Sequence, residues 1–313
     1  MRAIGVSELG DEDNFRVLDL PQPPMTDGGV RIRVHAATVN PTDTGFIRGA
    51  YFRGGEAPGG PYVPGMDAAG VVTEVGVGSR FTVGQEVMAV VLPTSASGGA
   101  YADELVLPEP QVVPVPAGVD AVPASTLLMN ALTARLALDA LGVPDGGTIA
   151  VTGAAGAFGG YVVQLAKADG LRVVADASDA DVDLVRSLGA DDVVARGAGF
   201  VDAVRELVPA GVDGLADGAV LDAGVLGAIR DGGALATIRG WSGPAERGVS
   251  VDAVMVFGSA GDTAKLERLR EQVESGELTL RVATTFPAAQ AADAHRMLAG
   301  GGVRGRIVLD FTG

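Results

Sequence analysis

One glycine-rich turn, set between a strand-like run and a helix-like run, constrains the fold of this chain more than any other feature of its sequence. Residues 148–152 have the short apolar pattern of a buried strand, and residues 156–168 have that of a helix. The turn has a GxxGxxG spacing and reads Gly153-Ala154-Ala155-Gly156-Ala157-Phe158-Gly159. This order predicts a site where backbone N–H groups at the helix N-terminus bind the diphosphate of a dinucleotide.

The glycines of this turn have a physical reason in such a site. A side chain at Gly153 or Gly156 would hold the phosphates away from the backbone, and its absence at Gly159 lets the helix pack closely on the sheet. The candidate coenzyme contacts in the turn are Gly153, Ala154, Ala155, Gly156, Ala157 and Phe158. The alternative is a turn whose glycines serve only to pack the helix.

The alternation of strand and helix continues on both sides of the turn. Before it, Leu128, Leu132 and Leu136 recur at the i+4 spacing of a helix face. Beyond it, strand-like runs at 171–175, around Val193, at 212–216 and at 234–238 alternate with helix-like runs at 182–188, 200–207 and 221–229. Units of this length force parallel pairing through right-handed crossovers, so residues 119–278 are predicted to form a Rossmann-type, doubly wound parallel sheet, the α/β class.

A different pattern occupies the first part of the chain. Up to about residue 118, short alternating apolar runs are broken by Gly and Pro, at 30–34, 69–75, 86–92 and 101–107. This pattern predicts an antiparallel, barrel-like β domain. A strand-like run at 278–284, a helix at 288–298 and a strand at 306–311 close the chain, and we expect residues 279–313 to return to the first domain, 1–118.

Composition excludes several classes of function. The formal net charge of −16 repels the phosphates of nucleic acids and of anionic membranes. No uninterrupted apolar run approaches the roughly 18 residues that span a bilayer, and the start of the chain lacks the hydrophobic region of a signal peptide. We therefore expect a cytoplasmic protein that binds neither nucleic acid nor membrane.

Cysteine and histidine usage narrows the chemistry further. The chain contains no cysteine, which excludes disulfides, thiol nucleophiles and thiolate zinc ligands. Its two histidines are His35, in a strand-like run, and His295, in a helix-like segment, and a Ser-His-Asp triad would have to use one of them. We expect both to be ordinary strand or surface residues and not catalytic bases.

The second strand of the parallel sheet ends at Asp176, Ala177 and Ser178, where a residue that reads the adenosine ribose belongs. An acidic side chain there accepts from both ribose hydroxyls and favours NAD(H), whereas a small residue backed by a cation favours NADP(H). Asp176 favours NAD(H), while Ser178 and Arg196, after the third strand, suit a 2′-phosphate. We expect NADP(H), with NAD(H) as the alternative.

Ordered sequence matches over nearly the whole chain resemble the medium-chain dehydrogenase/reductase superfamily, and within it the quinone oxidoreductases. The matching pieces, besides the glycine turn, are VNPTD at 39–43, RGAY at 48–51, PGMDAAGVV at 64–72, GAYA at 99–102, NALTA at 130–134, LGAD at 188–191 and GRIVL at 305–309. The resemblance implies a GroES-like β-barrel domain beside the Rossmann domain, a nicotinamide coenzyme and a homodimer.

The chain departs from the zinc alcohol dehydrogenases of that superfamily at the metal. Those enzymes place a cysteine where Asn40 stands and a histidine where Met66 stands, and their four-cysteine structural lobe is also missing here. Without a Lewis acid to polarise an alcohol oxygen, alcohol oxidation loses its usual activation. Reduction of a conjugated carbonyl suits such a site better, because the hydride lands on a carbon that is already electrophilic.

The resemblance also implies roles for named residues. Tyr51 matches a tyrosine that enoyl-reductase relatives are thought to use as proton donor, and with Asn40 it forms the candidate catalytic pair. Candidate pocket residues are Asp43, Met66 and Trp241, and candidate coenzyme contacts outside the turn are Asn130, Thr133, Ile238, Gly240, Phe257, Gly258 and Arg304. The alternatives are an ordinary wall aromatic at Tyr51, capping of a helix by Asn40 and Asp43, simple packing at Trp241 and a solvated Arg304.

Together these features predict hydride transfer from NADPH to a small quinone, enone or other α,β-unsaturated carbonyl, without a metal. Such transfer needs the nicotinamide held close to the acceptor in a dry crevice. Two alternatives stay open, an enoyl-thioester reductase and a non-catalytic NADPH-binding sensor or scaffold.

Overall fold

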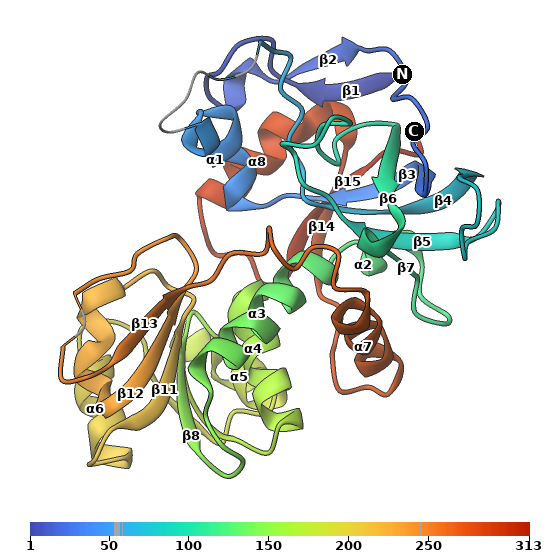
Figure 1. The fold of residues 1–313 in the computed structure, drawn as a ribbon. Coiled ribbons are helices and arrows are strands. Elements are labelled where there is room, and N and C mark those ends of the chain that lie inside the picture. Colours follow the sequence, from blue (N-terminus) through green and yellow to red (C-terminus); the bar gives the residue numbers. More distant parts are fainter. Residues whose placement is uncertain (53–56, 58, 245) are drawn as a thin grey trace. The chain divides into compact units, whose positions relative to one another are not determined.

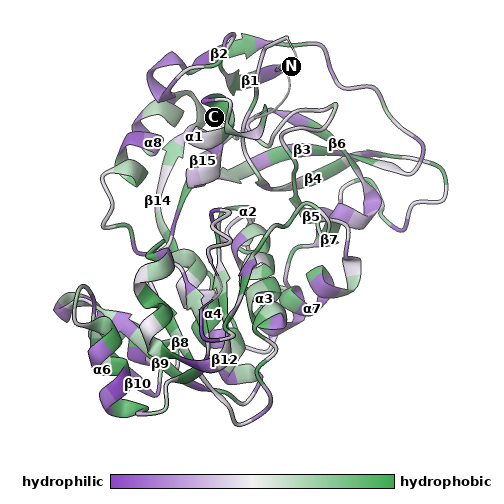
Figure 2. Ribbon diagram, turned by 60° about the vertical axis from the view of Figure 1, so that its left-hand side comes forward, coloured by the Kyte–Doolittle hydropathy of each residue, from purple (hydrophilic) through white to green (hydrophobic). Residues whose placement is uncertain are grey.

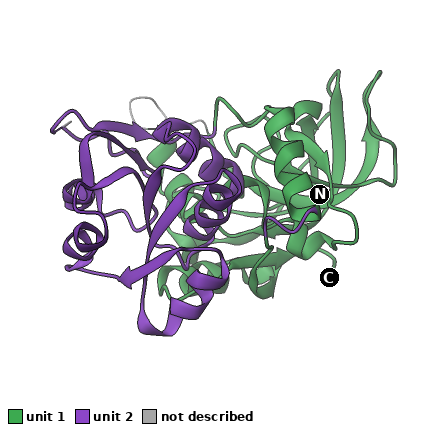
Figure 3. Ribbon diagram, turned by 90° about the horizontal axis from the view of Figure 1, so that it is seen from below, with its two compact units in different colours: residues 1–129, 257–274, 279–313 green, residues 130–256, 275–278 purple. Residues whose placement is uncertain are grey.

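The chain folds into two compact units, seen in separate colours in Figure 3. This computed structural model describes residues 1–52, 57, 59–244 and 246–313. Unit 1 comprises Met1–Met129, Phe257–Glu274 and Thr279–Gly313, and unit 2 comprises Asn130–Val256 and Ser275–Leu278. Residues 119–129 and 257–274, which the sequence analysis assigns to the dinucleotide domain, therefore pack in unit 1, while the domain limits themselves stay a prediction.

Unit 2 is built on a parallel six-stranded sheet with the order β10-β9-β8-β11-β12-β13 (Figure 1). Its strands are β8 (Thr148–Thr152), β9 (Arg172–Ala177), β10 (Asp192–Ala195), β11 (Val212–Asp217), β12 (Ile229–Thr237) and β13 (Ser250–Ala253). Its helices are α3 (Leu128–Leu141, which begins in unit 1), α4 (Ala157–Ala168), α5 (Val182–Ser187), α6 (Phe200–Leu207) and the 3-10 helices η4 (Asp179–Asp181) and η5 (Asp222–Ala228). The predicted Rossmann-type parallel sheet is confirmed.

The central strands of this sheet are apolar because both of their faces are covered. In β8, four of the five residues are buried, and in β9 five of six. Ala150, Val174, Leu215 and Leu235, one from each of four neighbouring strands, lie in one core cluster. This burial explains why these strands read as continuous apolar runs in the sequence.

Unit 1 contains a mainly antiparallel sheet with the order β14-β15-β3-β4-β5-β7, to which β6 adds by pairing with β3. Its strands are β3 (Gly29–Thr38), β4 (Asp67–Val75), β5 (Glu86–Val90), β6 (Glu104–Pro108), β7 (Val112–Pro114), β14 (Val282–Pro287) and β15 (Arg306–Asp310), and β1 (Arg2–Gly5) and β2 (Arg16–Asp19) form a separate pair. Its α-helices are α1 (Pro41–Ile47), α2 (Ala121–Ala124), α7 (Thr263–Glu274) and α8 (Ala291–Ala299), and its 3-10 helices are η1 (Glu12–Asn14), η2 (Ala50–Phe52), η3 (Glu109–Gln111) and η6 (Ala288–Gln290).

The end of the chain returns to this sheet as predicted, because β15 pairs with β3 in antiparallel fashion. The neighbouring pair, β14 with β15, is parallel. The predicted strand at 278–284 is wrong in its bounds, since β14 begins at Val282. The predicted strand at 101–107 likewise begins only at Glu104.

The predicted helix at 221–229 is also wrong, and the structure gives the reason. Residues Asp222–Ala228 form a 3-10 helix, and Ile229 already begins β12. The entry to this helix is held in an unusual backbone conformation, with φ of 58° at Val220 and 53° at Asp222. Positive φ at these residues is incompatible with an α-helix that starts at residue 221.

One segment, Ala121–Leu141, is long and apolar enough to cross a membrane when only length and composition are considered. It contains α2 and α3, and 61% of its most apolar window is buried inside the protein. Figure 2 shows the same apolar character along α3 and along the strands that form the cores. Because a buried core helix has this composition too, the segment is weak support for a membrane span.

Candidate coenzyme and substrate sites

The glycine-rich turn of unit 2 joins β8 to α4 as the sequence predicts. Gly153 has φ of +65°, and a Cβ there would lie 2.9 Å from the backbone of Gly218. Gly156 is the N-cap residue of α4, and its N–H donates to the Gly153 carbonyl at 2.9 Å. A Cβ at Gly159 would overlap that same carbonyl. The turn is therefore closed by backbone contacts that only glycine permits, which brings the start of α4 close against β8.

Asp176, near the end of β9, is tied to this turn. Its Oδ1 accepts a hydrogen bond from the Ala154 N–H at 3.0 Å, and the residue is only 6% exposed. Burial raises the pKa of the Asp176 carboxyl, while the Ala154 N–H and the Arg196 cation act against that shift. One carboxylate oxygen of Asp176 thus shapes the glycine turn, a role that the sequence analysis does not assign to it.

The neighbouring ribose candidates differ in their surroundings. Ala177 is buried, and the Ser178 hydroxyl donates to the Asp181 carboxylate. Arg196 follows β10, is exposed, and acts electrostatically on Asp176. Of these residues, Arg196 offers a cation near the carboxyl end of β9.

A second buried carboxylate, Asp217 at the end of β11, lies beside the turn and escaped the sequence analysis. Its Oδ1 accepts from the Thr152 hydroxyl at 2.6 Å, and its Oδ2 accepts from the N–H groups of Leu221 and Asp222, both at 2.7 Å. This carboxylate holds the backbone that follows β11 in the positive-φ conformation seen at Val220. The sequence signal that could have identified Asp217 is an aspartate at the end of a buried strand of the parallel sheet.

The other candidates in unit 2 lie on three segments. Asn130 and Thr133 are half-buried on one face of α3, and Ile238 and Gly240 follow β12, half-buried and exposed respectively. Trp241 packs against the core of the parallel sheet, and its carbonyl accepts from the Thr237 hydroxyl at 2.6 Å. The packing role considered for Trp241 therefore has direct contacts in the structure, and its predicted place in the substrate pocket stays a prediction.

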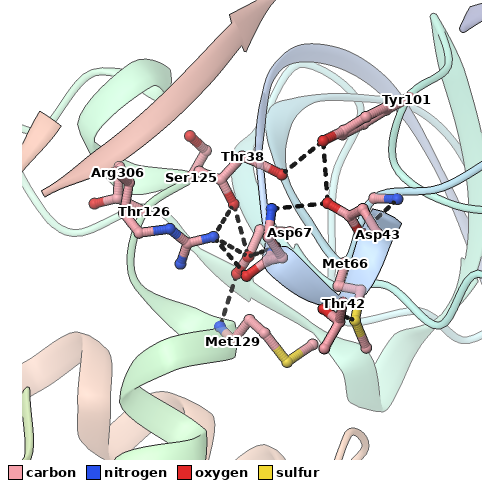
Figure 4. A network of polar contacts seen from close by, with 12 residues as sticks. Thr38, Thr42, Asp43, Met66, Asp67, Tyr101, Ser125, Thr126, Met129 and Arg306 are labelled. Carbon is pink, nitrogen blue, oxygen red and sulfur yellow. Dashed lines mark hydrogen bonds and ion pairs between the residues drawn. The ribbon is translucent and has the colours of Figure 1, made fainter. Parts of the chain in front are cut away.

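In unit 1, a buried ion pair organises the candidate catalytic region (Figure 4). Arg306 Nη2 lies 3.0 Å from Asp67 Oδ2, with side chains 4% and 1% exposed, and it also donates to the Thr38 hydroxyl at 2.6 Å. Asn40 is held by both partners: its Oδ1 accepts from Arg306 Nη2 at 2.9 Å and its Nδ2 donates to Asp67 at 3.1 Å. Asp67 Oδ1 accepts from the Met129 N–H at 2.7 Å. The Asn40 amide is thereby fixed in one orientation.

Met66 and Tyr51 meet through the methionine sulfur. The Sδ atom of Met66 accepts from the Thr42 hydroxyl at 3.3 Å and lies 3.9 Å from the Tyr51 hydroxyl. The Tyr51 ring makes edge contacts with Phe46 and Phe257, each at 5.7 Å between ring centroids. Burial, and secondly the charge of Asp43, raise the pKa of the Tyr51 phenol. Tyr51 is half-buried, and its hydroxyl is a hydrogen-bond donor on a ring that packs against Phe46 and Phe257.

Asp43 connects several segments of unit 1 from its position in the first turn of α1. Its Oδ2 accepts from the Asn40 N–H at 2.8 Å and from the Tyr101 hydroxyl at 3.0 Å, and its Oδ1 accepts from the Gly65 N–H at 3.1 Å. Asp43 is fully buried, and this burial raises its pKa to about 7 against the opposing effect of its hydrogen bonds. The helix-capping interpretation of Asn40 and Asp43 is confirmed, since the two form a capping box.

Of the remaining candidates in unit 1, Phe257 contacts Tyr51, Gly258 is exposed, and Arg304 donates to the carbonyl of its neighbour Val303 at 3.3 Å. The structure thus brings together Asn40, Asp43, Met66 and Tyr51, which come from one end of α1 and from its surroundings. Within the described parts of the chain, no three His, Cys, Asp or Glu side chains gather as a metal site requires.

The expectation of a strand or surface role for His295 was wrong. His295 lies on α8 with 2% of its surface exposed, and its Nε2 is 3.1 Å from the Tyr101 hydroxyl. Asp67, Tyr101 and Arg306 were not predicted as site residues, although each stands inside a motif that carries the family resemblance.

Comparison with known proteins agrees with this architecture. Residues 26–117 match the family described as Alcohol dehydrogenase GroES-like domain, and residues 188–309 match the family described as Zinc-binding dehydrogenase. The chain belongs to the medium-chain dehydrogenase/reductase superfamily. Within that superfamily it is similar to quinone oxidoreductases.

Three relatives illustrate the similarity. A chloroplastic quinone-oxidoreductase homolog of Spinacia oleracea is 34% identical over 62% of this chain and 60% of its own length. Quinone oxidoreductase of Rattus norvegicus is 33% identical over 66% of this chain and 62% of its own length. The solved structure of mycobacterial Rv1454c complexed with NADPH is 29% identical, covers 99% of this chain and 100% of that one, and superposes with a TM-score of 0.85. The matches thus span about 60% of the curated relatives' length and the full length of the solved structure.

Proposed function

We propose that this protein is a zinc-independent oxidoreductase that transfers hydride from NADPH to a quinone or another α,β-unsaturated carbonyl. The observation that carries the proposal is the joint presence of the closed glycine turn between β8 and α4 and of Tyr51 with the Asn40 and Met66 region, in a chain similar to quinone oxidoreductases. The homodimer and the cytoplasmic location stay predictions.

The residues of unit 2 fit a dinucleotide. The turn carries no side chain at Gly153, Gly156 or Gly159, so nothing larger than a methyl group, except Phe158, projects from its first six residues. Phe158 is buried beside Gly218, which leaves the backbone of the turn to bind phosphate oxygens. When bound, the coenzyme supplies the hydride.

The coenzyme preference rests on Arg196. One oxygen of Asp176 already accepts the Ala154 N–H, which leaves this side chain less able to accept from both ribose hydroxyls. The exposed Arg196 cation interacts electrostatically with Asp176, and such a cation suits a 2′-phosphate. The similar mycobacterial structure is complexed with NADPH. We therefore retain NADP(H) as the proposed coenzyme.

The residues of unit 1 supply the proton and the positioning. The Tyr51 hydroxyl carries its proton at neutral pH, since the ordinary pKa of a phenol is 10 and burial raises it further, so it can donate to an acceptor oxygen on which negative charge develops. Tyr51 would give its proton to the substrate oxygen as the substrate is reduced, and would regain a proton from solvent. Asn40 acts by fixing the start of α1, because its amide is engaged by Arg306 and Asp67.

Metal independence is supported by the donor groups themselves. An amide and a thioether replace a thiolate and an imidazole, and both are poor ligands for Zn²⁺. The Asn40 amide and the Met66 sulfur are further engaged in hydrogen bonds within unit 1. Elemental analysis of active protein should find zinc far below one equivalent, and chelators should leave the rate unchanged. Stoichiometric zinc that is lost together with activity would contradict the proposal.

Turnover is tested with NADPH and two acceptors, 1,4-benzoquinone and a 2-alkenal. We expect Tyr51→Phe to lose at least about a hundredfold in kcat, the lower end of general acid catalysis, with unchanged NADPH affinity measured by fluorescence. Tyr62→Phe is the matched control, because Tyr62 is a buried tyrosine of the same unit that packs on Phe46 and Phe52. Equal rates for Tyr51→Phe and the control would remove Tyr51 from the mechanism, and no turnover of the wild type with either acceptor would reject the proposed activity.

Coenzyme choice is tested by paired titration with NADPH and NADH. Arg196→Ala should weaken NADPH binding about tenfold and leave NADH binding unchanged, because a charge-assisted hydrogen bond to the 2′-phosphate is lost. Arg186→Ala, another exposed arginine of the same unit, is the control. Equal weakening of both coenzymes by Arg196→Ala would show that Arg196 does not read the 2′-phosphate.

A further inference from the structure

Four side chains of unit 1 form a continuous hydrogen-bond series that the proposed mechanism leaves unused. Asp43 Oδ2 lies 3.0 Å from the Tyr101 hydroxyl, which lies 3.1 Å from His295 Nε2, and His295 Nδ1 lies 3.0 Å from the Thr44 hydroxyl. Asp43 and Thr44 belong to α1, His295 to α8, and Tyr101 to the segment before β6. We call these four residues the buried chain.

Two members of the buried chain, His295 and Asp43, have pKa values shifted by burial in opposite directions. Phe15 packs on the His295 ring at 5.0 Å between centroids, and burial lowers the pKa of His295 to about 4. At neutral pH the imidazole is therefore neutral, with one nitrogen as donor and the other as acceptor. Burial raises the pKa of Asp43 to about 7, so this carboxyl exchanges a proton in the same pH range.

The geometry allows two complete proton arrangements. With Asp43 ionised, the Tyr101 hydroxyl donates to Asp43, His295 Nε2–H donates to the Tyr101 oxygen, and the Thr44 hydroxyl donates to His295 Nδ1. With Asp43 protonated on Oδ2, every one of these bonds reverses: Asp43 donates to Tyr101, Tyr101 to Nε2, and Nδ1–H to Thr44. Each arrangement satisfies all four groups, so the change from one to the other moves the imidazole proton from Nε2 to Nδ1.

The buried chain is connected to Tyr51 by contacts within unit 1. Asp43 Oδ1 accepts from the Gly65 N–H at 3.1 Å, and Gly65 precedes Met66, whose sulfur lies between the hydroxyls of Thr42 and Tyr51. An ionised Asp43 holds the Gly65 N–H by a charge-assisted hydrogen bond, which is stronger than the bond to a neutral carboxyl. The charge state of Asp43 therefore affects how firmly Met66 is held against Tyr51.

We propose that Asp43, Tyr101, His295 and Thr44 act as one reversible hydrogen-bond chain, and that Tyr101 and His295 are positioning residues which, through Asp43 and Gly65, hold Met66 and the Tyr51 hydroxyl in place for the reaction. The positioning part rests on the proposed function, whereas the reversal of the chain does not.

The charged and titratable groups around the buried chain are few among the described residues. Asp67 and Arg306 act electrostatically on Tyr101 in opposite directions, and Asp67 also acts on Asp43. Tyr51 faces Asp43 and responds to its charge. Burial lowers the pKa of His295. The proton of Asp43 is therefore the variable that reverses the chain near neutral pH.

The reversal of the hydrogen bonds is tested by imidazole nitrogen NMR on the full-length protein between pH 5.5 and 8.5, a range set around the pKa of Asp43 of about 7. The chain has only two histidines, so His35→Gln leaves the His295 signals alone and assigns them. We expect the His295 proton to move from Nδ1 to Nε2 as the pH rises, with no imidazolium signal. A single His295 tautomer throughout the pH range, or a tautomer exchange that persists in Asp43→Asn, would overturn the proposed reversal of the hydrogen bonds.

The positioning part is tested by the pH profile of kcat/KM with NADPH and 1,4-benzoquinone. In the wild type, the rate should rise with pH as Asp43 ionises. Tyr101→Phe removes a hydrogen bond that lowers the pKa of Asp43, so the midpoint should move to higher pH, with kcat reduced and NADPH affinity unchanged. Tyr62→Phe should leave the midpoint in place. The same midpoint in Tyr101→Phe and wild type would refute the positioning role.

His295 variants provide the rescue test. Gln at position 295 keeps an N–H donor for the Tyr101 oxygen, whereas Leu has none. His295→Gln should therefore retain most of the wild-type rate at high pH, and His295→Leu should lose it. Equal rates in the two variants would refute a hydrogen-bonding role for His295. If the wild type reduces no acceptor, the proposed function fails. The tautomer titration still tests the reversal of the hydrogen bonds, because it does not depend on activity.

Discussion

Replacing Asp43 by Asn should change how the stability of this protein depends on pH. The pKa of Asp43 is raised from 3.8 to about 7 in the folded protein, mainly by burial. The folded state therefore binds the Asp43 proton more tightly than the unfolded state does. The stabilisation of the folded state by this proton is fully present below pH 3.8 and is lost as the pH rises to about 7. At about 1.4 kcal/mol per pH unit, the loss amounts to about 4 kcal/mol.

His295 acts in the opposite direction over nearly the same range. Its pKa is lowered from 6.5 to about 4 by burial, so its contribution is present above pH 6.5 and is lost as the pH falls to about 4, by about 3 kcal/mol. In the wild type the two effects nearly cancel between pH 4 and 7. Each single substitution exposes the effect of the other residue.

The assay is urea unfolding of wild type, Asp43→Asn and His295→Gln at one-unit steps from pH 4.5 to 8, with each variant compared with wild type at the same pH. Relative to wild type, the free energy of unfolding of Asp43→Asn should increase as the pH rises, and that of His295→Gln should increase as the pH falls. The test uses only the change of this difference with pH, because the amide introduced in each variant does not titrate and shifts the free energy of unfolding by a constant amount. Differences from wild type that do not vary with pH in either variant would refute the reasoning.

Two further substitutions test single contacts. Arg306→Met should destabilise unit 1 by about 3 to 5 kcal/mol in urea unfolding, because it leaves the buried Asp67 carboxylate without its cation, and a loss below about 1 kcal/mol would contradict a buried ion pair. Gly153→Ala should lower both stability and coenzyme affinity, because a Cβ meets the Gly218 backbone in addition to the strain of positive φ. Gly146→Ala, with φ of +76° and open space around a Cβ, measures the strain alone, and an equal loss in the two variants would show that the contact with Gly218 has no effect.

Much of unit 2 could be predicted because its signals are local. The apolar runs of β8 and β11 were found within one residue, since strands covered on both faces show their burial directly in the sequence. The glycine turn was found for the same reason, because its constraint lies within seven consecutive residues. Asp222–Ala228 was predicted as part of an ordinary helix but forms a 3-10 helix, because its backbone is fixed by the side chain of Asp217 and not by any pattern of its own. The strand β13 was missed because none of its four residues is buried, which leaves no apolar pattern to detect.

The candidate catalytic region shows where sequence reasoning stops. Asn40 was singled out as catalytic from its place in a family motif, but its amide accepts from Arg306, 266 positions further along the chain, and donates to Asp67. His295, 194 positions from Tyr101, was set aside because a lone histidine on a helix carries no pattern that marks its partner. Residue type and motif thus identify where the chemistry lies, while the role of each side chain depends on partners that only the fold brings within hydrogen-bond distance. This is why we propose a positioning role for Asn40 from its contacts with Arg306 and Asp67, and a connection of Tyr101 and His295 to Tyr51 that no local pattern contains.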